Sequence, residues 1–167
     1  TQHLGAYEIE HKAKKMTFLD TPGHEAFSEM RRRGAKVADI AILVVSAVEG
    51  AQAQTVESLK ALKASSIPFI VAINKIDRPE ANPEKTRMSL ADHEVYLEGF
   101  GGTVSSVNIS AKSGQGVDDL LDMVSLTAEV ADLKGEETKN AEGVVIESDL
   151  DSRKGNAATF ILTDGTL

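Results

Sequence analysis

Three apolar runs rich in β-branched residues constrain the fold of this chain more than any other feature of its sequence. They comprise residues 16–19, 40–45 and 68–73, and the latter two are typical of strands buried on both faces. A polar or glycine-bearing turn follows each run, and stretches of helical character lie between them. Because parallel strands need a crossover connection, usually a helix, this alternation predicts an α/β domain with a parallel-rich sheet and helices on both of its faces.

The other elements are predicted from the same patterns. Asn82 precedes Pro83 and is a candidate N-cap residue. Residues 6–10 are expected to pair antiparallel with residues 17–19 and to form the edge of the sheet. Apolar residues at helical spacing, and one further apolar run, indicate four helices and a fourth strand. The expected helices are residues 25–33, 54–64, 83 to about 94 and 117 to about 131, and the expected strand is residues 104–109.

A change in composition at residues 134–142 predicts a domain boundary. This stretch carries glycine and several charged residues. Beyond it, residues 143–147 and 157–162 are expected to be strands around a polar loop, and two strands alone do not form a stable core. The predicted organisation is therefore an α/β domain at residues 1–133, a linker at 134–142 and the start of an all-β domain at 143–167.

Composition and charge exclude several classes of function. The sequence contains no cysteine, which removes disulfides, thiolate metal sites and thiol catalysis, and is compatible with a reducing compartment. The formal net charge of -8 at pH 7 argues against broad electrostatic binding to nucleic acid or an anionic membrane, so any polyanion contact has to be local. No run approaches the roughly 20 apolar residues of a membrane-spanning helix, and the first residues resemble no signal peptide. We therefore expect no membrane partner.

The turn after residues 68–73 has side chains that suit a purine base. Asn74-Lys75-Ile76-Asp77 supplies a carboxylate that can accept two parallel hydrogen bonds, from the ring N–H and the exocyclic amine of guanine, a pairing that adenine cannot reproduce. Asp77 would then select guanine, Asn74 could brace neighbouring loops, and the stem of Lys75 could cover the base. The alternative is an ordinary strand-to-helix turn, because this tetrapeptide also arises by chance.

The turn after residues 16–19 carries groups that suit phosphate chemistry. Asp20 could hold a magnesium-bound water, and Gly23 has an unhindered backbone N–H that could approach a terminal phosphate. His24 is a candidate for orienting an attacking water. A Pro-Gly turn is the alternative for the stretch, and a surface or capping role is the alternative for His24.

A third turn, Ser110-Ala111-Lys112, follows the strand expected at residues 104–109. The Ser110 hydroxyl could hold the Asp77 carboxylate in place, and the Ala111 N–H could donate to the guanine carbonyl oxygen. The tripeptide alone carries little weight, but the order along the chain does: D-x-x-G after an early strand, N-K-x-D after a later one and S-A-K after the next.

This set of motifs resembles the GTPases of the translation-factor class. Residues 20–27, Asp-Thr-Pro-Gly-His-Glu-Ala-Phe, and residues 31–35 are similar to bacterial-type translation initiation factor 2. Residues 1–7 resemble the switch I segment of that family, residues 75–83 its base-binding loop, and residues 143–167 the opening of its β-barrel domain. The resemblance implies a P-loop GTPase-type fold followed by the start of a β-barrel.

The resemblance also implies a role for each candidate residue. Thr1 matches the switch I threonine that coordinates Mg²⁺, Asp20 and Gly23 match the switch II contacts to metal and phosphate, and His24 matches the catalytic histidine that positions water. The implied cofactors are GTP or GDP and Mg²⁺. The positions that match the guanine-binding residues are Asn74, Lys75, Asp77, Ser110, Ala111 and Lys112.

One motif of this family is absent from the sequence. No G-x-x-x-x-G-K-[ST] occurs in it, and this motif forms the loop whose backbone N–H groups and lysine cradle the phosphates. Because the chain also begins with Thr1 in place of Met, we expect it to be truncated at its N-terminus. Losing several charge-assisted hydrogen bonds of roughly 1.5–3 kcal/mol each would leave the 167 residues inactive alone, with activity in the full-length protein.

The resemblance implies a translation initiation factor that binds and hydrolyses GTP during initiator tRNA placement and ribosomal subunit joining. Its partners would be the ribosome and, through domains not present here, initiator tRNA; it would be a monomer in the cytoplasm or, alternatively, in the mitochondrial matrix. Arg31-Arg32-Arg33 is either a solvated cluster or an RNA contact. The alternatives are a non-enzymatic module that binds the ribosome or a protein, and another translational GTPase such as an elongation factor.

Overall fold

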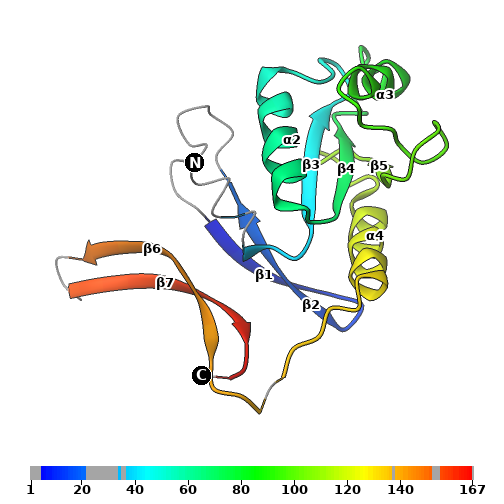
Figure 1. Ribbon diagram of the computed structural model, residues 1–167. Coiled ribbons are helices and arrows are strands. Elements are labelled where there is room, and N and C mark those ends of the chain that lie inside the picture. Colours follow the sequence, from blue (N-terminus) through cyan, green and yellow to red (C-terminus); the bar gives the residue numbers. More distant parts are fainter. Residues whose placement is uncertain (1–4, 22–33, 35–36, 137, 152–154, 167) are drawn as a thin grey trace. The chain divides into compact units, whose positions relative to one another are not determined.

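The computed structural model describes residues 5–21, 34, 37–136, 138–151 and 155–166 (Figure 1). The chain divides into two compact units: residues 39–131 form one, and residues 1–38 with residues 132–167 form the other. The helix predicted at residues 25–33 lies outside the described residues.

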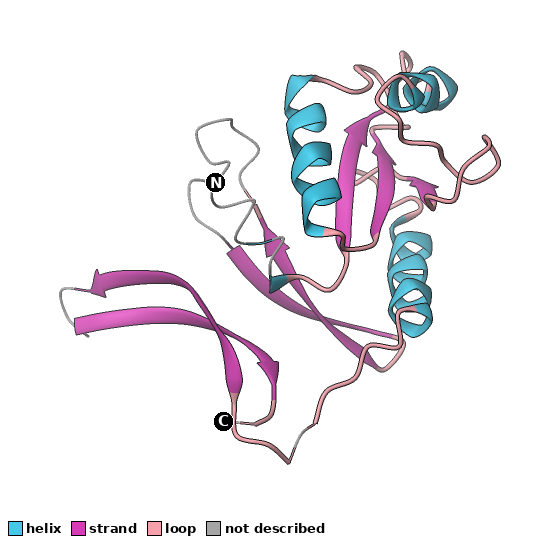
Figure 2. Cartoon of the chain, in the orientation of Figure 1, coloured by secondary structure: helices cyan, strands magenta, loops and turns pink. Residues whose placement is uncertain are grey.

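The unit of residues 39–131 is built on a parallel sheet of three strands, in the order β3-β4-β5. Its strands alternate along the chain with three helices (Figures 1 and 2), so the predicted α/β alternation is confirmed. The strands are β3 (Ala41–Ser46), β4 (Phe69–Asn74) and β5 (Ser106–Asn108). The helices are α2 (Ala53–Ser65), α3 (Pro83–Ala91) and α4 (Val117–Val130).

Both faces of β4 are buried, as its uninterrupted apolar run predicts, whereas the same prediction is wrong for β3, where Val44 is 57% exposed. Successive side chains of a strand point to opposite faces, so alternate residues of β3 and β4 enter two different apolar clusters. One cluster joins the sheet to α2 and α3 and includes Leu43, Val45, Val71, Ile73, Leu59, Leu62 and Leu90. The other joins it to α4 and includes Ile70, Ala72, Ile109 and Leu120. The predicted placement of helices on both faces is confirmed.

Helix α3 begins where the sequence predicts, but it ends earlier than predicted. Asn82 caps the helix through its side-chain oxygen, which accepts a hydrogen bond from the Lys85 N–H at 3.0 Å, and Pro83 is the first helical residue. The helix ends at Ala91 rather than near Glu94. Val95 and Leu97 are 2% and 1% exposed, and burying them turns the chain out of the helix, with a left-handed φ of 61° at Glu94.

The strand β5 is shorter than the predicted residues 104–109. Three of its residues pair with β4, the central strand, whereas Val104 forms an isolated bridge with Leu97. Val104 therefore pairs with Leu97, in the segment after α3, and not with β4.

The first hairpin consists of β1 (Gly5–His11) and β2 (Lys14–Asp20). Its antiparallel pairing, with Tyr7 opposite Phe18, confirms the predicted partners. β1 and β2 form a two-stranded sheet within the other compact unit, so their place at the edge of the parallel sheet stays a prediction. Positive φ angles at Lys12 and Ala13 close a tight turn, and the two strands are paired over seven residue pairs.

The second hairpin consists of β6 (Glu142–Asp151) and β7 (Gly155–Asp164), which also pair antiparallel. Both strands are longer than predicted. The Asp164 carboxylate accepts hydrogen bonds from the Glu136 N–H at 2.6 Å and the Lys139 ammonium at 3.1 Å, so the preceding segment is tied to the end of β7. The division into residues 1–133, 134–142 and 143–167 stays a prediction.

Among the helices that the structure describes, none combines the length and the apolar character needed to cross a membrane.

Candidate nucleotide-binding site

The candidate base-binding residues lie in the turns that follow β4 and β5. These strands are parallel neighbours, so their carboxyl ends meet at one edge of the sheet, where ligands bind in open α/β folds. The two turns are residues 74–77 and residues 110–112. They are adjacent in space, because the Ile76 N–H donates to the Ile109 carbonyl at 3.3 Å.

Asn74 connects the two turns through the oxygen of its side chain. This oxygen accepts one hydrogen bond from the Lys75 N–H at 2.7 Å and another from the Ala111 N–H at 3.0 Å. Asn74 is thus placed to brace neighbouring loops, the role the motif suggested. The Ala111 N–H, proposed as a donor to the guanine carbonyl, donates to Asn74 in this structure and would be shared with a bound base.

Ser110 fixes the carboxylate of Asp77. Its side chain is fully buried, and its hydroxyl donates to Asp77 Oδ1 at 2.7 Å. This hydrogen bond is the main reason that the pKa of Asp77 is below its usual value, with the nearby positive charges of Lys112 and Arg78 adding to the effect. Asp77 is itself exposed, so an ionised acceptor is presented at the surface in a fixed position.

The turn after β5 is held rigid by its backbone. The Ser110 N–H donates to the Gln115 carbonyl and the Gly114 N–H to the Ser110 carbonyl, both at 2.9 Å. Gly116, with a φ of 72°, precedes α4, and a Cβ atom there would lie 2.3 Å from the Asn108 carbonyl oxygen. Only glycine allows this close approach, which sets the path of the turn from β5 into α4.

Lys75 occupies an unusual backbone conformation for a residue with a side chain. Its φ is 67°, in the left-handed region that non-glycine residues seldom adopt. Its ammonium lies 3.1 Å from the carboxylate of Glu49, in the turn after β3. The motifs gave Glu49 no role. The signal in the sequence was its position in a polar turn after a buried strand, at the same edge as the other two turns.

The structure does not test the other predicted site residues against this group, because they lie in the other compact unit or outside the described residues. Asp20 is the last residue of β2, opposite Gly5 in the first hairpin. Thr1, Gly23 and His24 lie outside the described residues. The structure therefore brings together Asn74, Lys75, Asp77, Ser110 and Ala111 and leaves the predicted phosphate and metal contacts as predictions.

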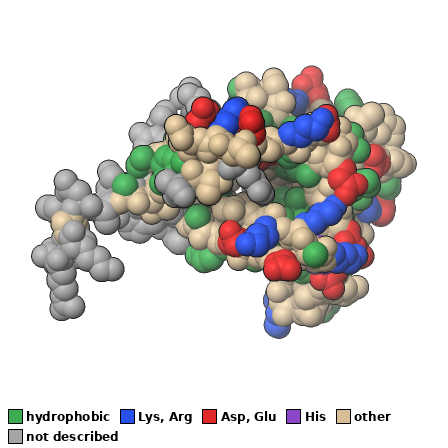
Figure 3. Space-filling model, turned by 90° about the horizontal axis from the view of Figure 1, so that it is seen from below, with side chains coloured by type: hydrophobic (Ala, Val, Ile, Leu, Met, Phe, Trp, Pro, Cys, Tyr) green, Lys and Arg blue, Asp and Glu red, His purple; other side chains and the backbone are tan. Residues whose placement is uncertain are grey.

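Acidic and basic side chains are interspersed among the described residues on the face drawn in Figure 3. Within the part of the chain that the structure describes, no group of three or more His, Cys, Asp or Glu side chains is placed to hold a metal ion.

A parallel α/β sheet with an N-K-x-D turn and an S-A-K turn braced together at its carboxyl edge places the chain in the class of GTP-binding domains. The chain belongs to the family described as the Elongation factor Tu GTP binding domain, whose model matches residues 1–129.

Sequence relatives of the chain include bacterial translation initiation factors IF-2. The chain is 52% identical over 167 residues to the factor from Bartonella tribocorum and 51% identical to that from Bacillus licheniformis. Each match covers 100% of this chain and 20% and 23%, respectively, of the relative. The chain thus spans about a fifth of the length of the curated relatives it matches.

Solved structures of translation factors share the fold. The elongation factor SelB of Methanococcus maripaludis, in complex with the GTP analogue GppNHp, matches with a TM-score of 0.78 at 27% identity over 99% of this chain and 36% of that chain. GDP-bound aIF5B of Aeropyrum pernix matches with a TM-score of 0.74 at 29% identity over the same shares.

We expect Ser110→Ala to raise the pKa of Asp77 toward its ordinary value. The substitution removes the hydroxyl that donates to the ionised carboxylate, so protonation becomes easier and the titration moves to higher pH. Titration of the Asp77 carboxyl carbon by NMR measures the change. Ser113→Ala is the control, because the Ser113 hydroxyl accepts from the Gln115 N–H, whereas the hydroxyl that donates to Asp77 is that of Ser110. An Asp77 pKa unchanged in Ser110→Ala would contradict this account of the site.

Proposed function

We propose that the full-length protein carrying this chain is a translation initiation factor that binds GTP and hydrolyses it on the ribosome. The observation that carries the proposal is the Asp77 carboxylate, held by Ser110 on a turn that Asn74 braces. An ionised carboxylate in a fixed position discriminates between bases, because guanine offers it two adjacent donors and adenine does not. Identity of 50% or more to bacterial IF-2 over the whole chain supports initiation over elongation.

We propose roles for the other residues by resemblance to the family. Thr1 and Asp20 would hold Mg²⁺ through hard oxygen ligands, Gly23 would contact the terminal phosphate, and His24 would orient the attacking water. Mg²⁺ keeps several waters and takes ligands from nucleotide phosphates, so it needs few oxygens from the protein. Hydrolysis would then depend on positioning and electrostatic stabilisation rather than on covalent chemistry.

The partners we propose are the ribosome and initiator tRNA. GTP would stabilise a ribosome-bound conformation during initiator tRNA placement and subunit joining, and hydrolysis would release it. We propose a monomer that acts in the bacterial cytoplasm, since the sequence relatives are bacterial factors.

Asp77→Asn tests the base assignment in the full-length protein. An amide presents one acceptor and one donor, so it cannot accept from both the ring N–H and the amine of guanine. We expect GDP affinity to fall roughly tenfold to hundredfold, the equivalent of one charge-assisted hydrogen bond, and xanthosine diphosphate to become the preferred ligand. Competition with a fluorescent nucleotide measures both affinities. Asp92→Asn, an exposed carboxylate at the end of α3, is the control. If Asp77→Asn still prefers guanine, the assignment is wrong.

His24→Ala tests the catalytic assignment. Loss of the group that orients water should slow ribosome-stimulated GTP hydrolysis by roughly a hundredfold or more while GTP affinity stays nearly unchanged. Single-turnover phosphate release measures the rate, and His93→Ala, a histidine after α3, is the matched control. Normal turnover in His24→Ala would remove His24 from the mechanism.

A further inference from the structure

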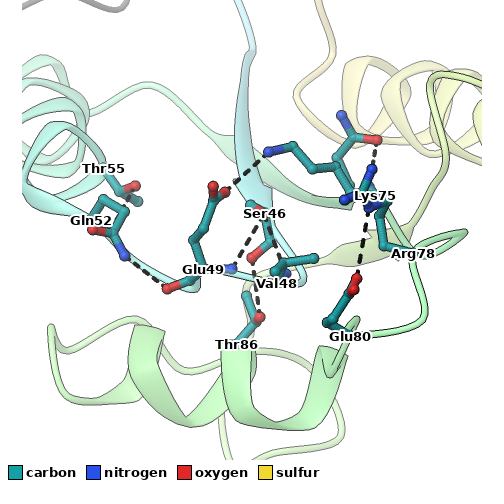
Figure 4. Close-up of polar contacts among 10 residues, drawn as sticks. Ser46, Val48, Glu49, Gln52, Thr55, Lys75, Arg78, Glu80 and Thr86 are labelled. Atoms are coloured by element: carbon teal, nitrogen blue, oxygen red, sulfur yellow. Dashed lines mark hydrogen bonds and ion pairs between the residues drawn. The ribbon is translucent and has the colours of Figure 1, made fainter.

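The turn between β3 and α2 lies against the proposed base-binding turn, and no sequence motif assigns it a role. Its Glu49 carboxylate contacts the Lys75 ammonium at 3.1 Å, across 26 positions of sequence (Figure 4). Lys75 is therefore fixed at two points. Its backbone N–H is bound by Asn74 at 2.7 Å and its ammonium by Glu49.

Glu49 is itself held by its neighbours. Its N–H donates to the Ser46 hydroxyl at 3.3 Å, and its carbonyl accepts from the Gln52 side chain at 2.8 Å. The Ser46 hydroxyl and then the Lys75 ammonium hold the pKa of Glu49 below its usual value, so the carboxylate is ionised at neutral pH. The negative charge of Glu49 that attracts the Lys75 ammonium is thus constant near pH 7.

The turn that carries Glu49 is anchored to the base-binding turn and to α3. The Ala47 N–H donates to the Asn74 carbonyl at 2.7 Å, and the Ala47 carbonyl accepts from the Asn82 N–H at 2.7 Å. Thr86, which is 1% exposed, donates to the Ser46 carbonyl at 3.3 Å. Glu49 therefore extends from a platform fixed relative to Asn74, unlike an ion pair between two mobile surface side chains.

The backbone and side chain of Lys75 explain what the ion pair with Glu49 can do. A left-handed backbone at a residue with a side chain is strained and persists only where the surroundings hold it. The lysine side chain is also flexible, and about half of it is exposed, so without a partner for the ammonium its stem would sample many positions. Pinning the ammonium limits the stem to few positions before a ligand arrives.

We propose that Glu49 is a positioning residue of the base site: by holding the Lys75 ammonium, it places the Lys75 methylene stem where that stem covers a bound guanine. With its ammonium bound to Glu49 at one side, the apolar stem of Lys75 can cover a flat base without burying the charge. The inference rests on the proposed function, because it assigns Glu49 to the same guanine site.

Glu49→Gln in the full-length protein tests the inference. The substitution keeps the size of the side chain and removes the charge that attracts Lys75. We expect the Kd for GDP to rise about threefold to fivefold, the range of an exposed ion pair, through faster dissociation. Fluorescent-nucleotide release measures dissociation directly. The matched control is Glu80→Gln. It removes the charge of a carboxylate in the same region, whose Oε2 lies 3.7 Å from Arg78 Nε, and it should leave the Kd for GDP unchanged (Figure 4).

A double-mutant cycle separates positioning from a general effect on folding. Lys75→Met keeps an apolar stem and removes the ammonium, so Glu49→Gln should cause no further loss of GDP affinity in that background. Glu49→Asp should restore part of the affinity lost in Glu49→Gln. The thermal midpoint of the nucleotide-free protein should be the same for wild type and Glu49→Gln, because the exposed pair adds little to stability.

The outcomes distinguish this inference from the function beneath it. Two results would overturn the positioning role and leave the guanine site intact. One is that Glu49→Gln binds GDP with wild-type affinity. The other is that Glu49→Gln lowers the GDP affinity of Lys75→Met as much as it lowers that of the wild-type protein. Failure of the wild-type protein to bind GDP would overturn the proposed function and the inference with it.

Discussion

The side-chain oxygen of Asn74 is the point on which the candidate site depends. It accepts hydrogen bonds from the Lys75 and Ala111 N–H groups, and so ties the end of β4 to a turn 37 positions further along the chain. The bond from Ser110 to Asp77 is a second tie between the same two turns. A base-recognition site needs its acceptor held in a fixed position. If the two turns separated, the Asp77 carboxylate would no longer be fixed relative to the groups around it.

The core beneath the site explains why these ties are effective. Asn74 and Lys75 directly follow Ile70 to Ile73, which are at most 1% exposed and pack on both faces of the sheet. The turn therefore starts from the most buried strand among the described residues, and the close packing of that strand holds the start of the turn in place. Glu49 extends the same arrangement to β3, so that groups following three neighbouring strands converge around Lys75 and Asp77.

The sequence predicted what local pattern determines and missed what distant contacts determine. The strands at residues 40–45 and 68–73 were evident because they are apolar at every position, and Asn82 before Pro83 marked the start of α3. The end of α3 depends on the burial of Val95 and Leu97, which no helical pattern reports. Within the site, the motifs named Asn74, Asp77 and Ser110, whereas the role of Glu49 follows from a contact with Lys75 that becomes visible only when β3 and β4 pair.

The central claim is that these braced turns form a site selective for guanine. Isothermal titration calorimetry of the full-length protein with GDP and with ADP, both in the presence of Mg²⁺, tests it most directly. The structure predicts saturable binding of GDP and no binding of ADP at the same concentrations, because adenine lacks the adjacent pair of donors that Asp77 accepts. Equal affinity for the two nucleotides, or no binding of GDP, would contradict it.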